Sequence, residues 1–174
     1  GDYLIEYRMM ISLIVNDSNN SKSEFHALND IVINHGQSGR IMKTEITVSG
    51  KYLNTYESDG LIISTPTGST AYSLSAGGPI ITPSIETITV TPICPHSLSA
   101  RAILLPANEI IEANNYNSNT ELSCTIDGQI FLTLSKDENI KIIKSPLSAE
   151  LIKLPGNNYF STLRSKMGWT GNLR

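Results

Sequence analysis

Short apolar stretches that alternate with polar residues recur along the chain, and turn-forming residues separate them. Residues 41–48 end in Glu-Ile-Thr-Val, an alternation with a period of two that is typical of a strand with one buried face. The residues Ser49-Gly50-Lys51 predict a hairpin turn into a further strand at 52–56. The other apolar stretches and strand candidates are 10–15, 27–33, 60–64, 88–90, 102–105, 109–113, 121–126, 130–134, 139–144 and 151–154.

Helical patterns are confined to two segments, 68–76 and 161–167, whereas 16–23 and 114–120 are polar stretches that predict exposed loops. The chain shows neither an internal repeat nor a linker that would separate two domains. The predicted fold class is therefore mainly β, a β-sandwich-like arrangement of many short strands with one or two short helices. We expect a single domain over residues 1–174.

Composition excludes several classes of protein. The 174 residues are 40% apolar, enough for a core, and 13 basic against 16 acidic residues argue against a nucleic-acid-binding face. No apolar run approaches the ~18 residues of a membrane span, and no basic-then-apolar leader opens the chain. The expected location is therefore the cytoplasm, without a nucleic-acid or membrane partner. The three histidines lack metal-ligand spacing, and Cys94 and Cys124 are expected as buried or half-buried reduced thiols.

The segment 59–79 is the most informative part of the sequence, because a buried strand runs into a turn with five hydroxyl side chains and then into the helical pattern. A helix start exposes unpaired N–H groups, which favour a phosphate or a polyol. Gly68 lacks a Cβ and would allow a ligand to approach closely. An over-capped helix with Tyr72 in the core explains the same residues, so both interpretations stay open.

The predicted helix places Ala71, Tyr72 and Ser75 on one face. The Tyr72 ring offers a surface for a base, and such stacking contributes ~1–3 kcal/mol. Ser75 offers a hydroxyl to a ring nitrogen.

Asn29 and Asp30 form a polar pair between apolar residues, and adjacent amide and carboxylate groups suit the cis-diol of a ribose. An Asx turn at a strand end explains the pair equally simply and is favoured by spacing alone. His96 is either a pocket residue or a hydrogen-bonded loop histidine. A Ser–His–Asp hydrolase is disfavoured because the chain lacks a G-x-S-x-G elbow, and the Walker A and G-x-G-x-x-G signatures are also missing.

Four segments together resemble the NAD kinases, and more narrowly their bacterial ATP-dependent branch. They spread over almost the whole chain, and the second of them is highly specific. They are Ala-Leu-Asn-Asp at 27–30, the run from Ser58 to Pro79 with Ser-Thr-Pro-Thr-Gly-Ser-Thr-Ala-Tyr at its centre, Pro-His-Ser-Leu-Ser-Ala-Arg at 95–101, and Lys-Met-Gly-Trp at 166–169.

This resemblance implies transfer of the ATP γ-phosphate to the 2′-hydroxyl of the adenosine ribose of NAD, with Mg²⁺ or another divalent cation, to give NADP. The family joins an N-terminal α/β domain to a C-terminal β domain, and this chain corresponds to the second. The Gly-Gly-Asp-Gly-Thr motif with the catalytic aspartate belongs to the first domain, so neither a catalytic residue nor a metal ligand is expected here. The resemblance also implies a homo-oligomer, usually a tetramer.

By resemblance, Asn29 and Asp30 hold ribose hydroxyls, residues 70–75 line the adenine and ribose pocket, and Asp59 reaches the nicotinamide end of a site completed by a neighbouring subunit. Two positions depart from the family, because many members carry Glu at 30 and some carry Arg at 57, where this chain has Asp and Glu. The expected NAD-binding residues are Asn29, Asp30, Arg40, Asp59, Thr70, Ala71, Tyr72, Ser73, Leu74, Ser75 and Gln129.

Two other functions remain as alternatives. One is a stand-alone, non-catalytic module that binds NAD or NADP or regulates a full kinase subunit. The other is a hydrolase that uses one of the serines, which the lack of a positioned base disfavours.

Overall fold

The computed structural model describes residues 2–16, 22–35, 41–115, 122–135, 138–156 and 158–169. The chain divides into two compact units, one made of Gly1–Tyr7 with Glu150–Arg174 and the other of Arg8–Ala149. The larger unit holds the features that concern function. The single domain expected over residues 1–174 stays a prediction.

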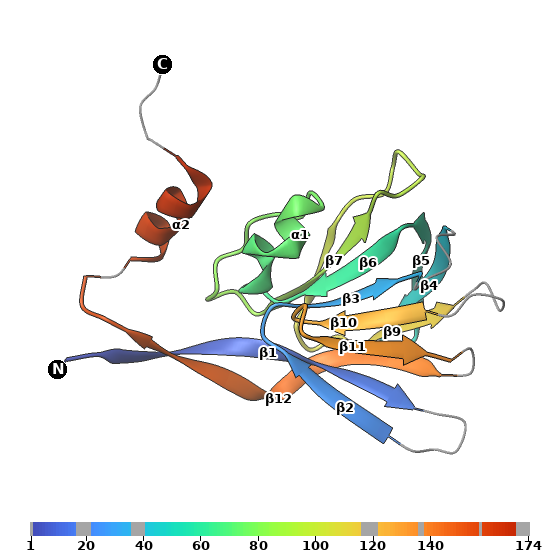
Figure 1. Cartoon of the computed structure of the whole chain (residues 1–174), viewed down its shortest axis with the longest axis horizontal. Helices are drawn as coiled ribbons and strands as arrows, with labels where there is room; N and C mark the ends of the chain where they lie inside the picture. Colours follow the sequence, from blue (N-terminus) through green and yellow to red (C-terminus); the bar gives the residue numbers. More distant parts are fainter. Residues whose placement is uncertain are drawn as a thin grey trace. The chain divides into compact units, whose positions relative to one another are not determined.

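The described residues form two six-stranded sheets (Figure 1). Neighbouring strands pair antiparallel, as β3 does with both β6 and β10. The first sheet has the order β2 (Lys22–Ala27), β1 (Leu4–Asn16), β12 (Asn139–Lys153), β9 (Ile111–Asn115), β4 (Met42–Val48), β5 (Lys51–Ser58). The second has the order β11 (Ile130–Leu134), β10 (Leu122–Ile126), β3 (Asp30–Asn34), β6 (Gly60–Ser64), β7 (Thr87–Ile93), β8 (Ile103–Pro106).

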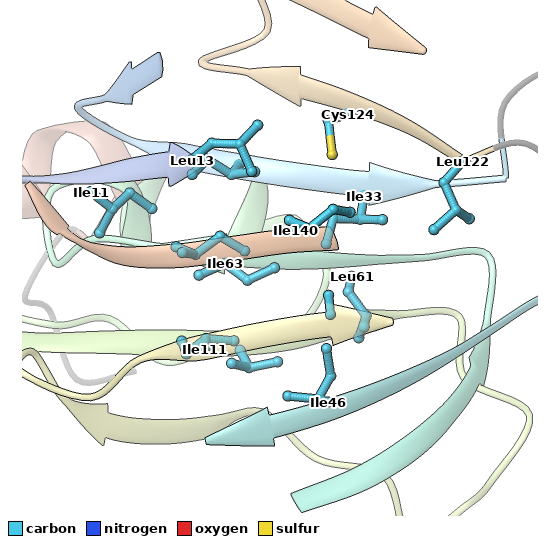
Figure 2. Close-up of a cluster of buried hydrophobic side chains, with 14 of the residues drawn as sticks. Ile11, Leu13, Ile33, Ile46, Leu61, Ile63, Ile111, Leu122, Cys124 and Ile140 are labelled. Atoms are coloured by element: carbon cyan, nitrogen blue, oxygen red, sulfur yellow. The ribbon is translucent and has the colours of Figure 1, made fainter. Parts of the chain in front are cut away.

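The hydrophobic core lies between these sheets, because alternate residues of each strand point inward. Figure 2 shows side chains of both sheets meeting, among them Ile46 and Ile111 of the first sheet and Leu61 and Ile63 of the second. These four side chains are fully buried. The predicted mainly β, sandwich-like fold class is confirmed.

Helical structure among the described residues is short, as predicted. It consists of the 3₁₀ turn η2 (Gly68–Thr70), the helix α1 (Tyr72–Ser75) and the helix α2 (Tyr159–Met167). The side chain of Asn158 caps α2 by accepting from the N–H of Phe160 at 2.8 Å. Gly168, with φ 65°, ends α2 in the left-handed conformation. No helix among the described residues is long and apolar enough to cross a membrane.

The predicted hairpin at 49–50 is confirmed, with φ 48° at Ser49 and 76° at Gly50. The strands predicted at 139–144 and 151–154 are present, but the break predicted between them is wrong, and so is the extent of the loop predicted at 16–23. The segments 139–144 and 151–154 belong to one strand, β12, because Pro146 sits in an exposed stretch where extended backbone needs no N–H donor. The predicted loop at 16–23 gives way to β2 from Lys22, an edge strand whose outer half is exposed and shows no apolar alternation. Most of the loop expected at 114–120 lies outside the described residues.

Both cysteines are free thiols, as expected, but only Cys124 is buried. Cys94 is exposed because it lies in the turn that follows β7. Burial, aided by the charge of Glu138, raises the pKa of the Cys124 thiol to about 12.

We expect iodoacetamide at pH 8 to alkylate Cys94 in the native protein and Cys124 only after denaturation, since the thiolate is the reactive form. Mass spectrometry of tryptic peptides measures both. Similar alkylation rates for the two thiols in the native protein would contradict this assignment.

Candidate functional site

The hydroxyl-rich segment after β6 does not form the single helix expected over 68–76. Its backbone turns once as η2, leaves the helical region at Ala71 with φ −98° and ψ −131°, and then forms the four-residue α1. Figure 1 shows α1 next to β6, close to where β3 begins. A helix this short aligns few peptide dipoles, so the predicted phosphate site at a helix start loses its basis.

Several hydroxyls of this segment bond within the protein, whereas the buried Ser64 hydroxyl has no hydrogen-bond partner among the described residues. The Ser69 hydroxyl donates to the Pro66 carbonyl at 2.7 Å and accepts from the N–H of Ile81 at 3.0 Å. The buried hydroxyls of Ser73 and Thr91 lie 3.0 Å apart, which ties α1 to β7. These groups build the loop and are turned away from a ligand.

Gly68 permits a close approach, but of the protein's own backbone. A Cβ at this position would lie 2.0 Å from the carbonyl oxygen of Asn29 and 2.4 Å from its carbonyl carbon. Thr65, three residues earlier, forms hydrogen bonds to the backbone of residues 28 and 29. Its N–H donates to the Asn29 carbonyl at 2.9 Å, and its hydroxyl donates to the Leu28 carbonyl at 2.5 Å. The expected role of Gly68 in admitting a ligand is therefore replaced by a packing role.

The opposite edge of the same segment is held by Asp127, in the turn between β10 and β11. Its Oδ2 accepts from the N–H of Leu28 at 2.8 Å, and its Oδ1 accepts from Asn29 at 2.7 Å and Asp30 at 3.0 Å. Its own N–H donates to the Asp30 carbonyl at 3.0 Å. Hydrogen bonds to a charged group contribute about 1.5–3 kcal/mol each, so this contact fixes residues 28–30 firmly.

A cavity of about 390 Å³ opens beside the fixed segment. It lies on the face of the second sheet turned away from the core, where Val32, Thr125 and Phe131 stand in one cross-strand row. The predicted residues that line it are Asn29, Asp30, Ala71 and Tyr72. The lining residues that sequence reasoning missed are Val32, Asn34, Thr125, Asp127, Gly128 and Phe131.

Asp30 is the chemically distinctive residue of the cavity. It is only 5% exposed, and among the described residues its carboxylate has no hydrogen-bond partner. Burial, and secondarily the negative charge of Asp127, raises the pKa of Asp30 to about 6. At neutral pH this carboxylate is therefore mostly ionised and can only accept hydrogen bonds. A ligand hydroxyl that donates to this carboxylate would offset part of the desolvation that raises its pKa.

Two aromatic side chains add flat apolar surface to the cavity. Tyr72 is 48% exposed and Phe131 is 76% exposed. The alternative that Tyr72 is a core residue is therefore wrong. An exposed ring beside a carboxylate and an amide suits a ligand that joins an aromatic base to a sugar.

The remaining predicted site residues do not line this cavity. Thr70 and Leu74 are half-buried, and Ser75 is exposed on α1. Gln129 is exposed and its N–H donates to the Ile126 carbonyl at 2.9 Å. Arg40 lies outside the described residues.

Asp59 lies at the far end of β6. It is exposed, and its N–H donates to the Ile93 carbonyl at 3.0 Å. Five residues of extended chain, about 17 Å, separate it from Ser64, which pairs with Asp30. Two residues earlier, Glu57 forms an ion pair with Lys43 at 2.9 Å, and this hydrogen-bonded lysine lowers the pKa of Glu57.

One Ser–His contact bears on the hydrolase alternative. The hydroxyls of Ser12 and Ser145 lie 2.9 and 3.0 Å from Nδ1 of His26. Both serines are buried and neither lines the cavity, so this contact joins strands of the first sheet. His96 is exposed, and its N–H donates to the Glu57 carbonyl at 2.9 Å. Within the described residues, no three His, Cys, Asp or Glu side chains gather as a metal site.

Among the cavity residues that sequence reasoning missed, Asp127 and Gly128 carry a recognisable sequence signal, that of a turn. Asp127-Gly128 stands between two alternating strands, and both residues have the positive φ, 50° and 66°, of a tight hairpin turn. The sequence thus marks a turn here, but a turn signal does not say that its carboxylate reaches residues 28–30.

Comparisons with known proteins identify the family of this chain. Residues 28–154 match the family described as ATP-NAD kinase C-terminal domain. An NAD kinase of Gemmatimonas aurantiaca is 40% identical over 172 residues, which are 98% of this chain and 60% of that protein. An NAD kinase of Syntrophotalea carbinolica is 42% identical over 169 residues, which are 97% of this chain and 59% of that protein. The chain thus spans about 60% of the length of these curated relatives.

Solved structures show the same fold. A yeast NADH kinase complexed with NADH superposes with a TM-score of 0.88 at 31% identity, covering 98% of this chain and 50% of that one. An NAD kinase from Archaeoglobus fulgidus in complex with ATP superposes with a TM-score of 0.76 at 26% identity, covering 92% of this chain and 61% of that one.

The substitution Gly68→Ala tests the packing of the loop. The added Cβ meets backbone that no side-chain rotation can move, so we expect the free energy of unfolding to fall by about 1–3 kcal/mol, with distortion of the cavity. Urea denaturation measures the loss. Gly50→Ala is the comparison without a close contact, because its Cβ meets open space and its cost comes from the positive φ of 76° alone. A loss at Gly68 no larger than at Gly50 would contradict the close contact.

The buried carboxylate of Asp30 predicts a pH-dependent stability. Its folded-state pKa of about 6 lies above the ordinary 3.8, so the folded protein holds this proton more tightly. The contribution of Asp30 to stability is full below about pH 3.8 and is lost as pH rises through about 6. Relative to the wild type, Asp30→Asn should therefore gain stability between pH 4 and pH 7 in urea denaturation. A stability difference independent of pH would contradict the shift.

Proposed function

Because the chain belongs to the ATP-NAD kinase family, whose C-terminal domain it carries over residues 28–154, we propose that it forms the NAD-binding part of an NAD kinase. The reaction moves the γ-phosphate of ATP to the 2′-hydroxyl of the adenosine ribose of NAD, and the products are NADP and ADP. ATP, the phosphate donor, and NAD, the acceptor, are the proposed ligands of the whole protein.

The observation that carries this proposal is the unpartnered carboxylate of Asp30 at the cavity wall, next to Asn29. An ionised carboxylate accepts from a ribose hydroxyl, while the Asn29 amide can donate to one hydroxyl oxygen and accept from another. When both side chains are fixed, they hold the two ribose hydroxyls in one orientation relative to the adenine base. This is the requirement for phosphorylating one particular hydroxyl.

The adenine is placed against Tyr72, whose half-exposed ring lies at the same cavity. Ala71 beside it is small and lets the base approach the loop. The other predicted residues, Thr70, Ser73, Leu74 and Ser75, belong to the loop that carries Tyr72. Arg40 and Gln129 are assigned as outer contacts of the dinucleotide.

The phosphoryl donor and the catalytic aspartate are assigned to the part of the protein outside these 174 residues, as the shorter span relative to the curated relatives suggests. The ATP bound to the archaeal relative supports ATP as donor. A divalent cation would enter with the ATP phosphates. The described residues bring no metal-binding set together, so no residue of this chain is assigned to that cation.

Asp59 is assigned to the nicotinamide end of a neighbouring copy's site, because it lies at the far end of β6 from the cavity. This assignment requires a homo-oligomer, for which we propose a tetramer in the cytoplasm.

A stand-alone binding module is the second candidate. The observation behind it is that Asn29, Asp30 and Tyr72 line one cavity within these 174 residues. Such a module would bind NAD or NADP without turning it over.

Incubation of the full-length gene product with NAD, ATP and Mg²⁺ tests the main proposal, with NADP measured by a NADP-specific dehydrogenase. Calorimetric titration of the same protein with NAD⁺, together with its oligomeric state, accompanies the assay. NADP formation supports the kinase. Saturable NAD binding without NADP formation would favour the binding module, and neither binding nor turnover would exclude both.

Tyr72→Ala tests the stacking assignment. Loss of ~1–3 kcal/mol of base stacking should weaken NAD binding by about 5- to 150-fold. Tyr52→Ala is the matched control, because Tyr52 is also an exposed tyrosine but lies on β5 in the other sheet. Equal NAD affinity of both variants in calorimetry would overturn the assignment.

A further inference from the structure

We propose that Asp127 is the positioning residue of the site: its carboxylate holds the backbone of residues 28–30 so that Asn29 and Asp30 present their side chains to the ribose. The inference rests on the proposed NAD-binding function, and it adds a residue from a different part of the sequence to that function. Asp127 is not among the site residues that the sequence predicts.

The geometry leaves the Asp127 carboxylate little capacity for a ligand. Three consecutive backbone N–H groups converge on its two oxygens at 2.7–3.0 Å. Successive N–H groups of a turn form a concave site for an anion, and here the anion belongs to the protein itself. Asp127 therefore acts on the ligand through residues 28–30.

The contacts on the other edge explain why this hold is effective. Thr65 donates hydrogen bonds to the carbonyls of Leu28 and Asn29, while the Asp127 carboxylate accepts from the N–H groups of residues 28–30. Both edges of the segment are therefore hydrogen-bonded. Gly68 packs against Asn29 from the same side as Thr65. With the peptide groups fixed, the side chains of Asn29 and Asp30 have a defined origin at the cavity wall.

Asp127 also sets the electrostatic environment of Asp30. The groups that the described structure places against Asp30 come from β6 through Ser64, from the 65–68 loop, and from the β10–β11 turn through Asp127. α1 adds Tyr72, which lines the same cavity, so Asp127 and Tyr72 are the described titratable groups around Asp30 and Asp127 is the one carboxylate among them. Its negative charge disfavours ionisation of Asp30, so the positioning contact and the protonation state of Asp30 are coupled.

The substitution Asp127→Asn separates these effects from simple unfolding. Asn has the same size and tolerates the positive φ of 50° at this position. Its Oδ1 can still accept N–H groups, but its Nδ2 cannot accept the N–H of Leu28, and the negative charge is lost. Asp127→Glu restores the charge on a longer side chain and tests whether the position of the carboxylate matters.

The experiment uses the full-length protein and measures three quantities for each variant. They are kcat with KM for NAD and for ATP, the pH dependence of kcat/KM for NAD, and hydrogen exchange of the backbone N–H groups of residues 28–30 without nucleotide. Gly50→Ala is the control, because it strains a comparable hairpin turn in the other sheet, away from the cavity.

For Asp127→Asn we expect KM for NAD to rise about tenfold and KM for ATP to change less than twofold. The acidic limb of the pH profile should move to lower pH, since Asp30 then ionises more easily. Exchange at residues 28–30 should accelerate more than exchange in β6 or β10. Asp127→Glu should recover the pH profile but not the KM. Gly50→Ala should lower the melting temperature without changing either KM.

Unchanged exchange at residues 28–30 in Asp127→Asn would overturn the proposal, whether or not the enzyme is active. So would an equal rise of KM for NAD and ATP, which indicates general damage, or an unmoved acidic limb. A wild-type protein that neither binds nor phosphorylates NAD, yet shows the accelerated exchange in Asp127→Asn, would instead overturn the proposed function and leave the structural contact standing.

Discussion

The hydrogen bonds that enclose residues 28–30 are the constraint on which the site depends. The segment leads into β3, the strand that pairs with both β6 and β10, so its edges face the loops that follow or precede those strands. Thr65 bonds the carbonyls and Asp127 bonds the N–H groups. Without these bonds, a polar turn would carry Asn29 and Asp30 at the mouth of the cavity with several backbone conformations available, and their use for recognition would cost ordering entropy.

This arrangement changes the meaning of the hydroxyl-rich segment that follows β6. Its composition suggests a ligand-binding loop, yet the buried hydroxyls of Ser69 and Ser73 form hydrogen bonds to neighbouring backbone and to Thr91. What the loop offers to a ligand is mainly Tyr72 and Ala71 at its tip. In the proposed site, recognition is therefore divided between a scaffold of small polar residues and a few exposed groups, which keeps the binding geometry precise at low entropic cost.

The chain holds a binding cavity but is shorter than the curated relatives that it matches. The proposed function accordingly gives this chain only the binding of the acceptor nucleotide. In the proposed site, Asp30 is the buried carboxylate beside the cavity, and burial raises its pKa to about 6. The ion pair of Glu57 with Lys43 shows that an acidic residue at position 57 is neutralised by its neighbouring strand.

The sequence by itself determined the mainly β fold, most strand positions and the hairpin at Ser49-Gly50, because alternation and turn residues are local properties of the chain. The site that it predicts from Asn29, Asp30 and Tyr72 stays a prediction, although the structure places these residues on one cavity. The sequence could not assign a partner to Gly68, whose neighbour is a backbone almost forty residues away, or show that α1 would shrink to one turn. Only the tertiary structure decided that Asp127 bonds residues 28–30, that Phe131 joins the cavity, and that Asp59 lies apart from it. Strand order and register create these contacts, and they are set by burial of the whole core rather than by any segment alone.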